Sequence, residues 1–139
     1  MGGVHFEYEV DGENFASAGN ASESVKRTLK QLGVSPASVR RVAIAMYEGE
    51  INMVIHAHGG KAEVEIFPDH IEIRLIDRGP GIADIDLAMK AGYSTATENI
   101  RSLGFGAGMG LPNMKKYSDE MTIDSTVGVG TTVYLRIDF

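Results

Sequence analysis

The chain of 139 residues contains neither cysteine nor tryptophan. Without thiols it has no disulfide framework and no cysteine ligands for a structural zinc ion. A chain of this length can bury a hydrophobic core without such cross-links. We therefore expect a single domain over residues 1–139 in a reducing compartment, which favours the cytoplasm.

Basic residues are scarce as well, because 13 Lys and Arg stand against 19 Asp and Glu and give a net charge of −6. Such a chain lacks the basic face that nucleic-acid backbones and anionic membrane surfaces require. The longest apolar run, Val42–Tyr47, is far shorter than the ~20 residues of a membrane-spanning helix. Neither nucleic acid nor a membrane is expected as a partner.

What the sequence does contain is a set of regular hydrophobic patterns. Period-two alternation predicts strands at Val4–Val10, Ala62–Ile66, Ile71–Leu75, Met121–Asp124 and Thr132–Asp138. Helical spacing predicts helices at Asn20–Leu32, Ser35–His56, Asp84–Ala91 and Leu111–Tyr117. The order predicts an α+β fold, a two-layer α/β sandwich with a mixed, mostly antiparallel sheet and the helices on one face.

The ends of these segments carry further signals. Asn20 and Glu23 form a capping-box pattern at the start of the first helix. Gly33 stands where a left-handed helix end belongs, and Ser35 with Pro36 indicates a new helix start. The N-terminal strand is predicted at a sheet edge, where it would allow two copies to pair in a homodimer.

Glu48 and Asn52 lie four residues apart in the second predicted helix, so the carboxylate and the amide share one face. Mg²⁺ prefers oxygen ligands such as a side-chain amide oxygen, and a carboxylate beside it can orient or deprotonate a bound water. The competing interpretation is an ordinary solvated helix face.

Two glycine-rich segments follow along the chain. At Asp77–Gly81 the glycines let the backbone approach a flat ligand, and the aspartate can accept from an exocyclic amine such as that of adenine. Gly104–Leu111 has glycine at every second position up to Gly110, directly before a predicted helix whose amides would attract phosphate oxygens. The competing interpretations are an ordinary strand-ending turn and a flexible surface loop.

In this order the motifs Glu48-x-x-x-Asn52, Asp77-x-Gly79-x-Gly81, Gly106-x-Gly108-x-Gly110 and Gly130–Leu135 resemble the GHKL ATPase superfamily, which has the Bergerat ATP-binding fold. The resemblance runs from Ser38 to the C-terminus. Within the superfamily the chain looks like the anti-sigma-factor serine kinases and related switch kinases, and histidine kinases are more distant relatives.

The resemblance implies ATP and Mg²⁺ as cofactors and a role for each matched residue. Asn52 would bind Mg²⁺, Glu48 would be the catalytic general base on a serine or threonine hydroxyl, and Asp77 would bind the adenine amino group. The other nucleotide-binding positions that it implies are Gly79, Gly81, Ile82, Thr95, Gly104, Gly106, Ala107, Gly108, Met109, Gly110, Leu111 and Thr131.

The resemblance leaves two details of the phosphate region open. Its four glycines permit two registers, Gly104–Gly108 or Gly106–Gly110, of which we prefer the second because Leu111 then opens the helix. Tyr93–Phe105 would form a lid over the nucleotide. Its Ser94–Thr97 segment lacks the lysine that many anti-sigma-factor kinases carry there, which puts cationic help to the γ-phosphate in doubt.

The expected partner is a small regulatory protein, a sigma factor or a sigma-factor antagonist, which accepts the phosphoryl group. Two alternatives stay open. One is a nucleotide-gated protein-binding module without phosphotransfer, which the missing lysine favours. The other is a histidine-kinase-like catalytic domain that acts on a separate chain.

Overall fold

The computed structural model describes residues 3–11, 19–57, 59–79, 81–82, 89 and 110–139. The elements, in chain order, are β1 (Val4–Asp11), α1 (Asn20–Gln31), α2 (Pro36–Ala57), β2 (Gly59–Ile66), β3 (His70–Asp77), α5 (Gly110–Lys116), β4 (Glu120–Thr126) and β5 (Gly130–Asp138). Each predicted element in these residues is confirmed, with ends shifted by a few residues. Of the predicted helix at Asp84–Ala91, only residue 89 lies within the described part of the chain.

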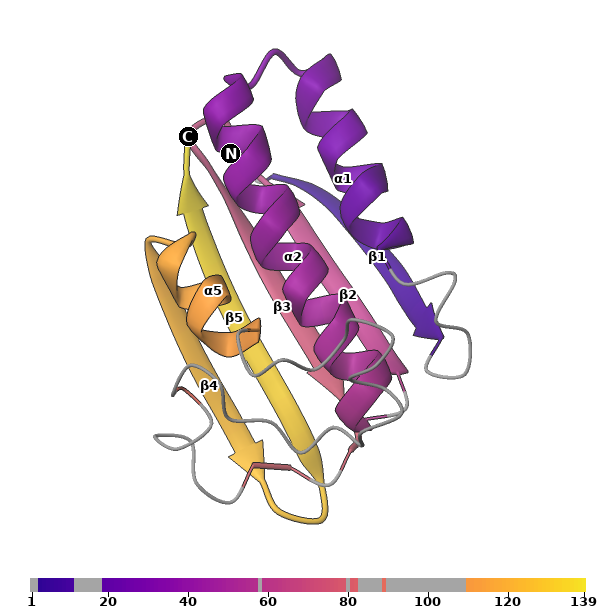
Figure 1. The fold of residues 1–139 in the computed structure, drawn as a ribbon. Helices are drawn as coiled ribbons and strands as arrows, with labels where there is room; N and C mark the ends of the chain where they lie inside the picture. The colour runs from indigo at the N-terminus through magenta and orange to yellow at the C-terminus, as the bar shows by residue number, and fades with distance from the viewer. Residues whose placement is uncertain (1–2, 12–18, 58, 80, 83–88, 90–109) are drawn as a thin grey trace, which may run out of the picture.

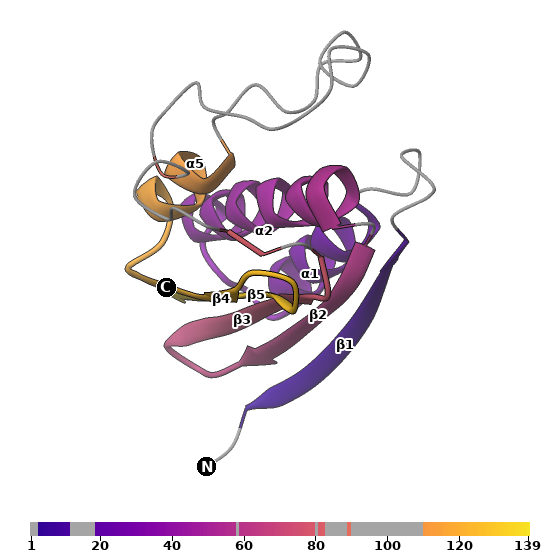
Figure 2. The ribbon, with the colours of Figure 1, turned by 90° about the horizontal axis from the view of Figure 1, so that it is seen from below.

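The strands form one sheet in the order β1-β2-β3-β5-β4. All four pairings in it are antiparallel, and β1 occupies one edge as predicted. Figure 2 shows α1, α2 and α5 together on one face of this sheet, so the predicted two-layer sandwich is confirmed. None of the helices that the structure describes is both long enough and apolar enough to cross a membrane.

The core lies between the sheet and α1 and α2. Strand alternation places every second side chain on the inner face of the sheet, and in β3 these are the buried Ile71, Ile73 and Leu75. The helices cover them with residues spaced by three or four positions: Val25 and Leu29 of α1, and Val39, Val42 and Met46 of α2. This packing fixes α2 across the middle of the sheet.

The start of α1 differs from the prediction. Gly19, with φ of 96°, precedes the first helical residue Asn20, and no side-chain cap is present there. Instead the buried carboxylate of Glu50 in α2 accepts hydrogen bonds from three backbone N–H groups: Gly19 at 2.9 Å, Ala21 at 3.3 Å and Ser22 at 2.6 Å. The capping box of Asn20 and Glu23 is therefore wrong, because a neighbouring helix supplies the anion for these free amides.

The connection between α1 and α2 is as predicted. Gly33 has φ of 79° and ends α1 in the left-handed conformation. The Ser35 hydroxyl then accepts a hydrogen bond from the Ser38 N–H at 3.4 Å, and Pro36 is the first residue of α2. This tight connection sets the two helices side by side in opposite directions (Figure 1).

Candidate functional site

Predicted site residues from four distant segments come together at one end of the sandwich, where α2 and β3 end and α5 and β5 begin (Figure 1). The β3–β5 register pairs Asp77 with Thr131. A Cβ atom built on Gly60 would lie 3.0 Å from the Met53 sulfur and 3.1 Å from the Asp77 Cα. The helix turn that follows Asn52 therefore lies directly above the end of β3.

Glu48 is half-buried on α2. Burial raises the pKa of its carboxyl group because desolvation disfavours the charged form, and the neighbouring Asn113 side chain of α5, which can donate to the carboxylate, partly offsets that rise. A carboxylate with a raised pKa is a stronger base than an exposed glutamate, and a base of this kind suits proton abstraction from a hydroxyl group.

Asn52 stands one helical turn after Glu48, and its amide group lies against the start of α5. A Cβ atom on Gly110 would be only 2.8 Å from both Oδ1 and Nδ2 of Asn52, so only glycine fits there without displacing the amide. Nδ2 donates to the Met114 sulfur at 3.9 Å, which is a weak contact. Oδ1 has no hydrogen-bond donor within the described part of the chain, and it is the kind of oxygen that Mg²⁺ binds.

The two carboxylate oxygens of Asp77 differ in their hydrogen bonds. Oδ1 accepts hydrogen bonds from the backbone N–H of Gly79 at 2.9 Å and of Thr131 at 3.1 Å. These bonds fasten the turn after β3 to the first residues of β5. Oδ2 accepts no hydrogen bond from any residue that the structure describes, so this oxygen remains able to accept from a ligand.

Sequence reasoning missed Ser125, which joins the glycine turn to the last hairpin. Its hydroxyl accepts from the Ile82 N–H at 2.7 Å and is 2.8 Å from the Thr131 hydroxyl. Gly81, with φ of 79°, passes so close to Thr126 that an added Cβ would meet its carbonyl oxygen. A signal existed, because Ser125 continues the inward-facing alternation of Met121 and Ile123 in β4.

The structure describes only part of the predicted phosphate-binding segment. Gly110 and Leu111 form the first turn of α5, and Leu111 is half-buried against the core. The lid at Tyr93–Phe105 and the choice of register lie outside the described residues. So do the other predicted positions of that segment: Thr95, Gly104, Gly106, Ala107, Gly108 and Met109.

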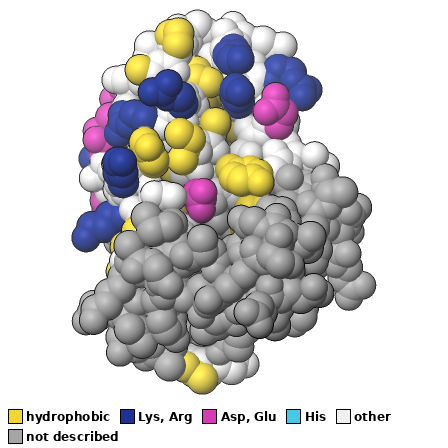
Figure 3. All heavy atoms as spheres, in the orientation of Figure 1, with side chains coloured by type: hydrophobic (Ala, Val, Ile, Leu, Met, Phe, Trp, Pro, Cys, Tyr) yellow, Lys and Arg dark blue, Asp and Glu magenta, His cyan; other side chains and the backbone are white. Residues whose placement is uncertain are grey.

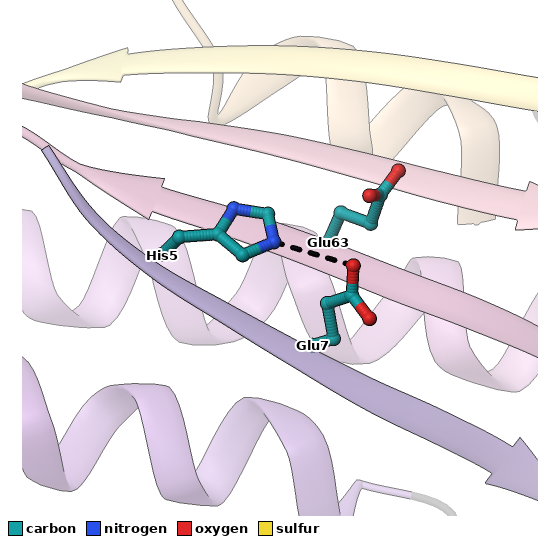
Figure 4. A group of neighbouring side chains, drawn as sticks. All are labelled: His5, Glu7 and Glu63. Carbon is teal, nitrogen blue, oxygen red and sulfur yellow. Dashed lines mark hydrogen bonds and ion pairs between the residues drawn. The ribbon is translucent and has the colours of Figure 1, made fainter. Parts of the chain in front are cut away.

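A second cluster of potential ligands, His5, Glu7 and Glu63, lies on the outer face of β1 and β2 (Figure 4). The His5 Nε2 atom is 3.3 Å from a Glu7 oxygen, and the Lys61 ammonium is 3.8 Å from the same oxygen. The hydrogen bond from His5 and the charge of Lys61 lower the pKa of Glu7. Since Glu7 is exposed and already contacts His5 and Lys61, the cluster is a set of ordinary surface contacts.

The profile of a family described as histidine kinase-, DNA gyrase B-, and HSP90-like ATPase matches residues 37–139. The chain belongs to this family. The predicted resemblance to the GHKL ATPases is thereby confirmed, and with it the expectation of an ATP-binding domain. The match includes Glu48, Asn52, Asp77 and Thr131, the residues gathered at one end of the sandwich.

Individual members of this ATPase family are similar over most of their length. An anti-sigma F factor of Caldanaerobacter subterraneus subsp. tengcongensis is 33% identical over 122 residues, which cover 81% of this chain and 82% of the relative. The serine/threonine-protein kinase RsbT of Bacillus subtilis is 31% identical over 112 residues, 78% of each chain. An anti-sigma F factor of Clostridium beijerinckii is 29% identical over 142 residues, 98% of this chain and 92% of the relative.

Proposed function

We propose that this chain is an ATP-dependent serine/threonine protein kinase of the anti-sigma-factor or switch-kinase type, which phosphorylates a small regulatory protein. The observation that carries the proposal is Glu48, a half-buried carboxylate with a raised pKa one helical turn before the Asn52 amide. A base next to a cation ligand is what phosphoryl transfer to a hydroxyl group requires. The printed names of the relatives, a serine/threonine kinase and anti-sigma factors, support the same assignment.

In this proposal each described residue has one task. Glu48 takes the proton of the acceptor hydroxyl, and Asp77 binds the adenine amino group through Oδ2 while Oδ1 stays on the backbone. Gly79 and Gly81 leave room for the adenine ring beside β3, and the Thr131 hydroxyl, which contacts the Ser125 hydroxyl, supports the ring from β5.

The residues present also fit a magnesium ion. Asn52 offers an amide oxygen without a donor among the described residues, and Gly110 keeps the space in front of that amide free of a side chain. Asn52 would hold the ion, which would supply charge neutralisation on the phosphate oxygens. As predicted from the sequence, the backbone amides of Gly104–Gly110 would bind the phosphate groups of the nucleotide.

A second candidate function is a nucleotide-gated binding module, in which ATP changes affinity for a partner without phosphotransfer. The absence of lysine from Ser94–Thr97 favours it, because the γ-phosphate then lacks one source of cationic stabilisation. Both candidates use the same nucleotide site and differ in the need for Glu48.

The test is to incubate the protein with lysate proteins in the presence and absence of Mg²⁺-ATP, and to map phosphosites on those retained or released. We expect one small protein to gain phosphoserine or phosphothreonine with the wild type and with the exposed control Glu9→Ala, and not with Glu48→Ala. A partner captured only with ATP and never modified would establish the gated module instead. Phosphorylation by Glu48→Ala at the wild-type rate would contradict the role of Glu48.

A further inference from the structure

An open groove of about 860 Å³ runs between α1 and α2 on the outer side of the helical layer. It extends from the connection of the two helices, at Lys30 and Pro36, to Tyr47 and Glu48. Figure 3 shows this face of the molecule, where basic side chains surround apolar ones. One end of the groove thus contains the proposed catalytic base, and the other end is remote from the nucleotide.

The two helices line the groove with side chains at regular helical spacing. Pro36, Arg40, Ile44 and Glu48 follow one another every four residues along α2, a stripe about 18 Å long at 1.5 Å per residue. Lys26 and Lys30 lie one turn apart on α1 and form the facing wall. The α2 stripe matches about three turns of a third helix packed on top, and the shorter α1 wall would contact one turn of it.

Three cations, Lys26, Lys30 and Arg40, line the groove against two carboxylates, Glu23 and Glu48, so its charge is slightly positive whereas the whole chain carries −6. Lys26, Lys30 and Arg40 make no ion pair with any residue that the structure describes. Cations on a helix are often simply solvated. Here they frame an apolar floor that includes half-buried Ile44 and Tyr47, whose side chain is 40% exposed.

We propose that this groove binds an acidic amphipathic helix of the phosphoryl acceptor protein. Its apolar face would pack on Ile44 and Tyr47, and its carboxylates would pair with the cations of both walls. A helix held in this way leads toward Glu48, so the groove would align the acceptor protein with the base. The inference rests on the proposed phosphotransfer and adds the chemistry and the place of partner recognition.

The probe is a display library of 16-residue helical peptides with leucine fixed on one face and the polar face randomised, selected on the full-length protein. We expect the enriched peptides to be acidic. Lys26→Glu/Lys30→Glu and Arg40→Glu should each weaken their binding about tenfold, because each variant turns attraction into repulsion. The matched control is Arg27→Glu, an exposed residue of α1 that does not line the groove, and its affinity should stay within about twofold.

Neutral or basic enriched peptides, no enrichment, or equal loss of binding in Arg27→Glu would overturn the inference. Preferential binding of the wild type to phosphatidylserine vesicles, with the same charge dependence, would assign the cations to a membrane and overturn it too. Thermal unfolding of each variant shows whether a loss reflects misfolding, and the exposed Arg40 provides the single substitution that least disturbs the fold.

The inference and the proposed function fail separately. Phosphotransfer to an acceptor that is unchanged in rate by charge reversal at Lys26, Lys30 and Arg40 would overturn the docking groove and leave the kinase assignment standing. Acidic peptides bound at the groove, with no protein phosphorylated, would overturn the kinase assignment and leave the groove as a binding site for an acidic helix.

Discussion

Two glutamates stand on opposite faces of α2, two positions apart, and have different environments. Glu50 is 2% exposed, and its carboxylate is bound by the amides of Gly19, Ala21 and Ser22 at the start of α1. Glu48 is half-buried, its pKa is raised, and Asn113 is the partner that lowers it. The first carboxylate has its hydrogen-bond partners within the fold, whereas the second is desolvated without such compensation.

The difference shows how a stable helix can also carry a reactive group. A buried anion that binds several backbone amides stabilises the fold and has little capacity left for a ligand. A desolvated anion with one weak partner is held at some cost to stability, which is typical of functional sites. Asp77 combines both situations, because Oδ1 binds two amides and Oδ2 binds none that the structure describes.

The largest effect is expected from Glu48→Gln, which should reduce the phosphotransfer rate by about 10²–10⁴-fold by removing the general base. Burial raises the pKa of Glu48, so its ionised form lowers stability above that pKa. Glutamine should therefore leave the free energy of unfolding at neutral pH unchanged or slightly larger. Urea unfolding and phosphotransfer assays measure the two, and a large loss of stability would contradict the contrast with Glu50.

Glu50→Ala should do the opposite and reduce the free energy of unfolding by about 3 kcal/mol, because it leaves buried amides at the start of α1 without an acceptor. Urea unfolding gives the value. The control is Glu23→Ala, an exposed side chain in the first turn of α1, which should change stability by no more than about 0.5 kcal/mol. Equal effects of the two substitutions would show that the α1 amides do not depend on Glu50.

A smaller effect is expected from Asp77→Asn, which distinguishes the roles of the two carboxylate oxygens. Asparagine can keep Oδ1 on the amides of Gly79 and Thr131 but places a donor where Oδ2 stood. ATP affinity should fall by about 2 kcal/mol, and stability by about 1 kcal/mol at most. Calorimetric titration with ATP and urea unfolding test this; an unchanged ATP affinity would assign Asp77 a purely structural role.

Local patterns were sufficient for the fold because the chain alternates regularly where it forms strands. The β2–β3 hairpin was predicted from Ala62–Ile66 and Ile71–Leu75, with inward positions that are all buried. Ser35 and Pro36 likewise start α2 through contacts within one turn. The spacing of Glu48 and Asn52 put them on one helix face without any knowledge of the sheet.

Contacts between distant segments could not be predicted in the same way. The capping box at Asn20 was a valid local pattern, but Glu50, 30 positions further along the chain, binds the Gly19, Ala21 and Ser22 amides at that helix start instead. Its signal was a charged residue on the apolar face of α2, between Met46 and Met53. The contact of Asn52 with Gly110 depends on the packing of α5, which no sequence period encodes.

The smallest effect concerns Asn113, the side chain among the described residues that lowers the pKa of Glu48. Asn113→Ala removes the donor beside Glu48 and leaves desolvation unopposed, so the pKa of Glu48 should rise further. Because the base must be ionised, the acid limb of the phosphotransfer rate should move to higher pH, with an unchanged rate on the alkaline plateau. Asn20→Ala, which changes an exposed side chain at the first residue of α1, should leave the profile in place. A profile unmoved by Asn113→Ala, or a shift to lower pH, would mean that another group sets the acid limb.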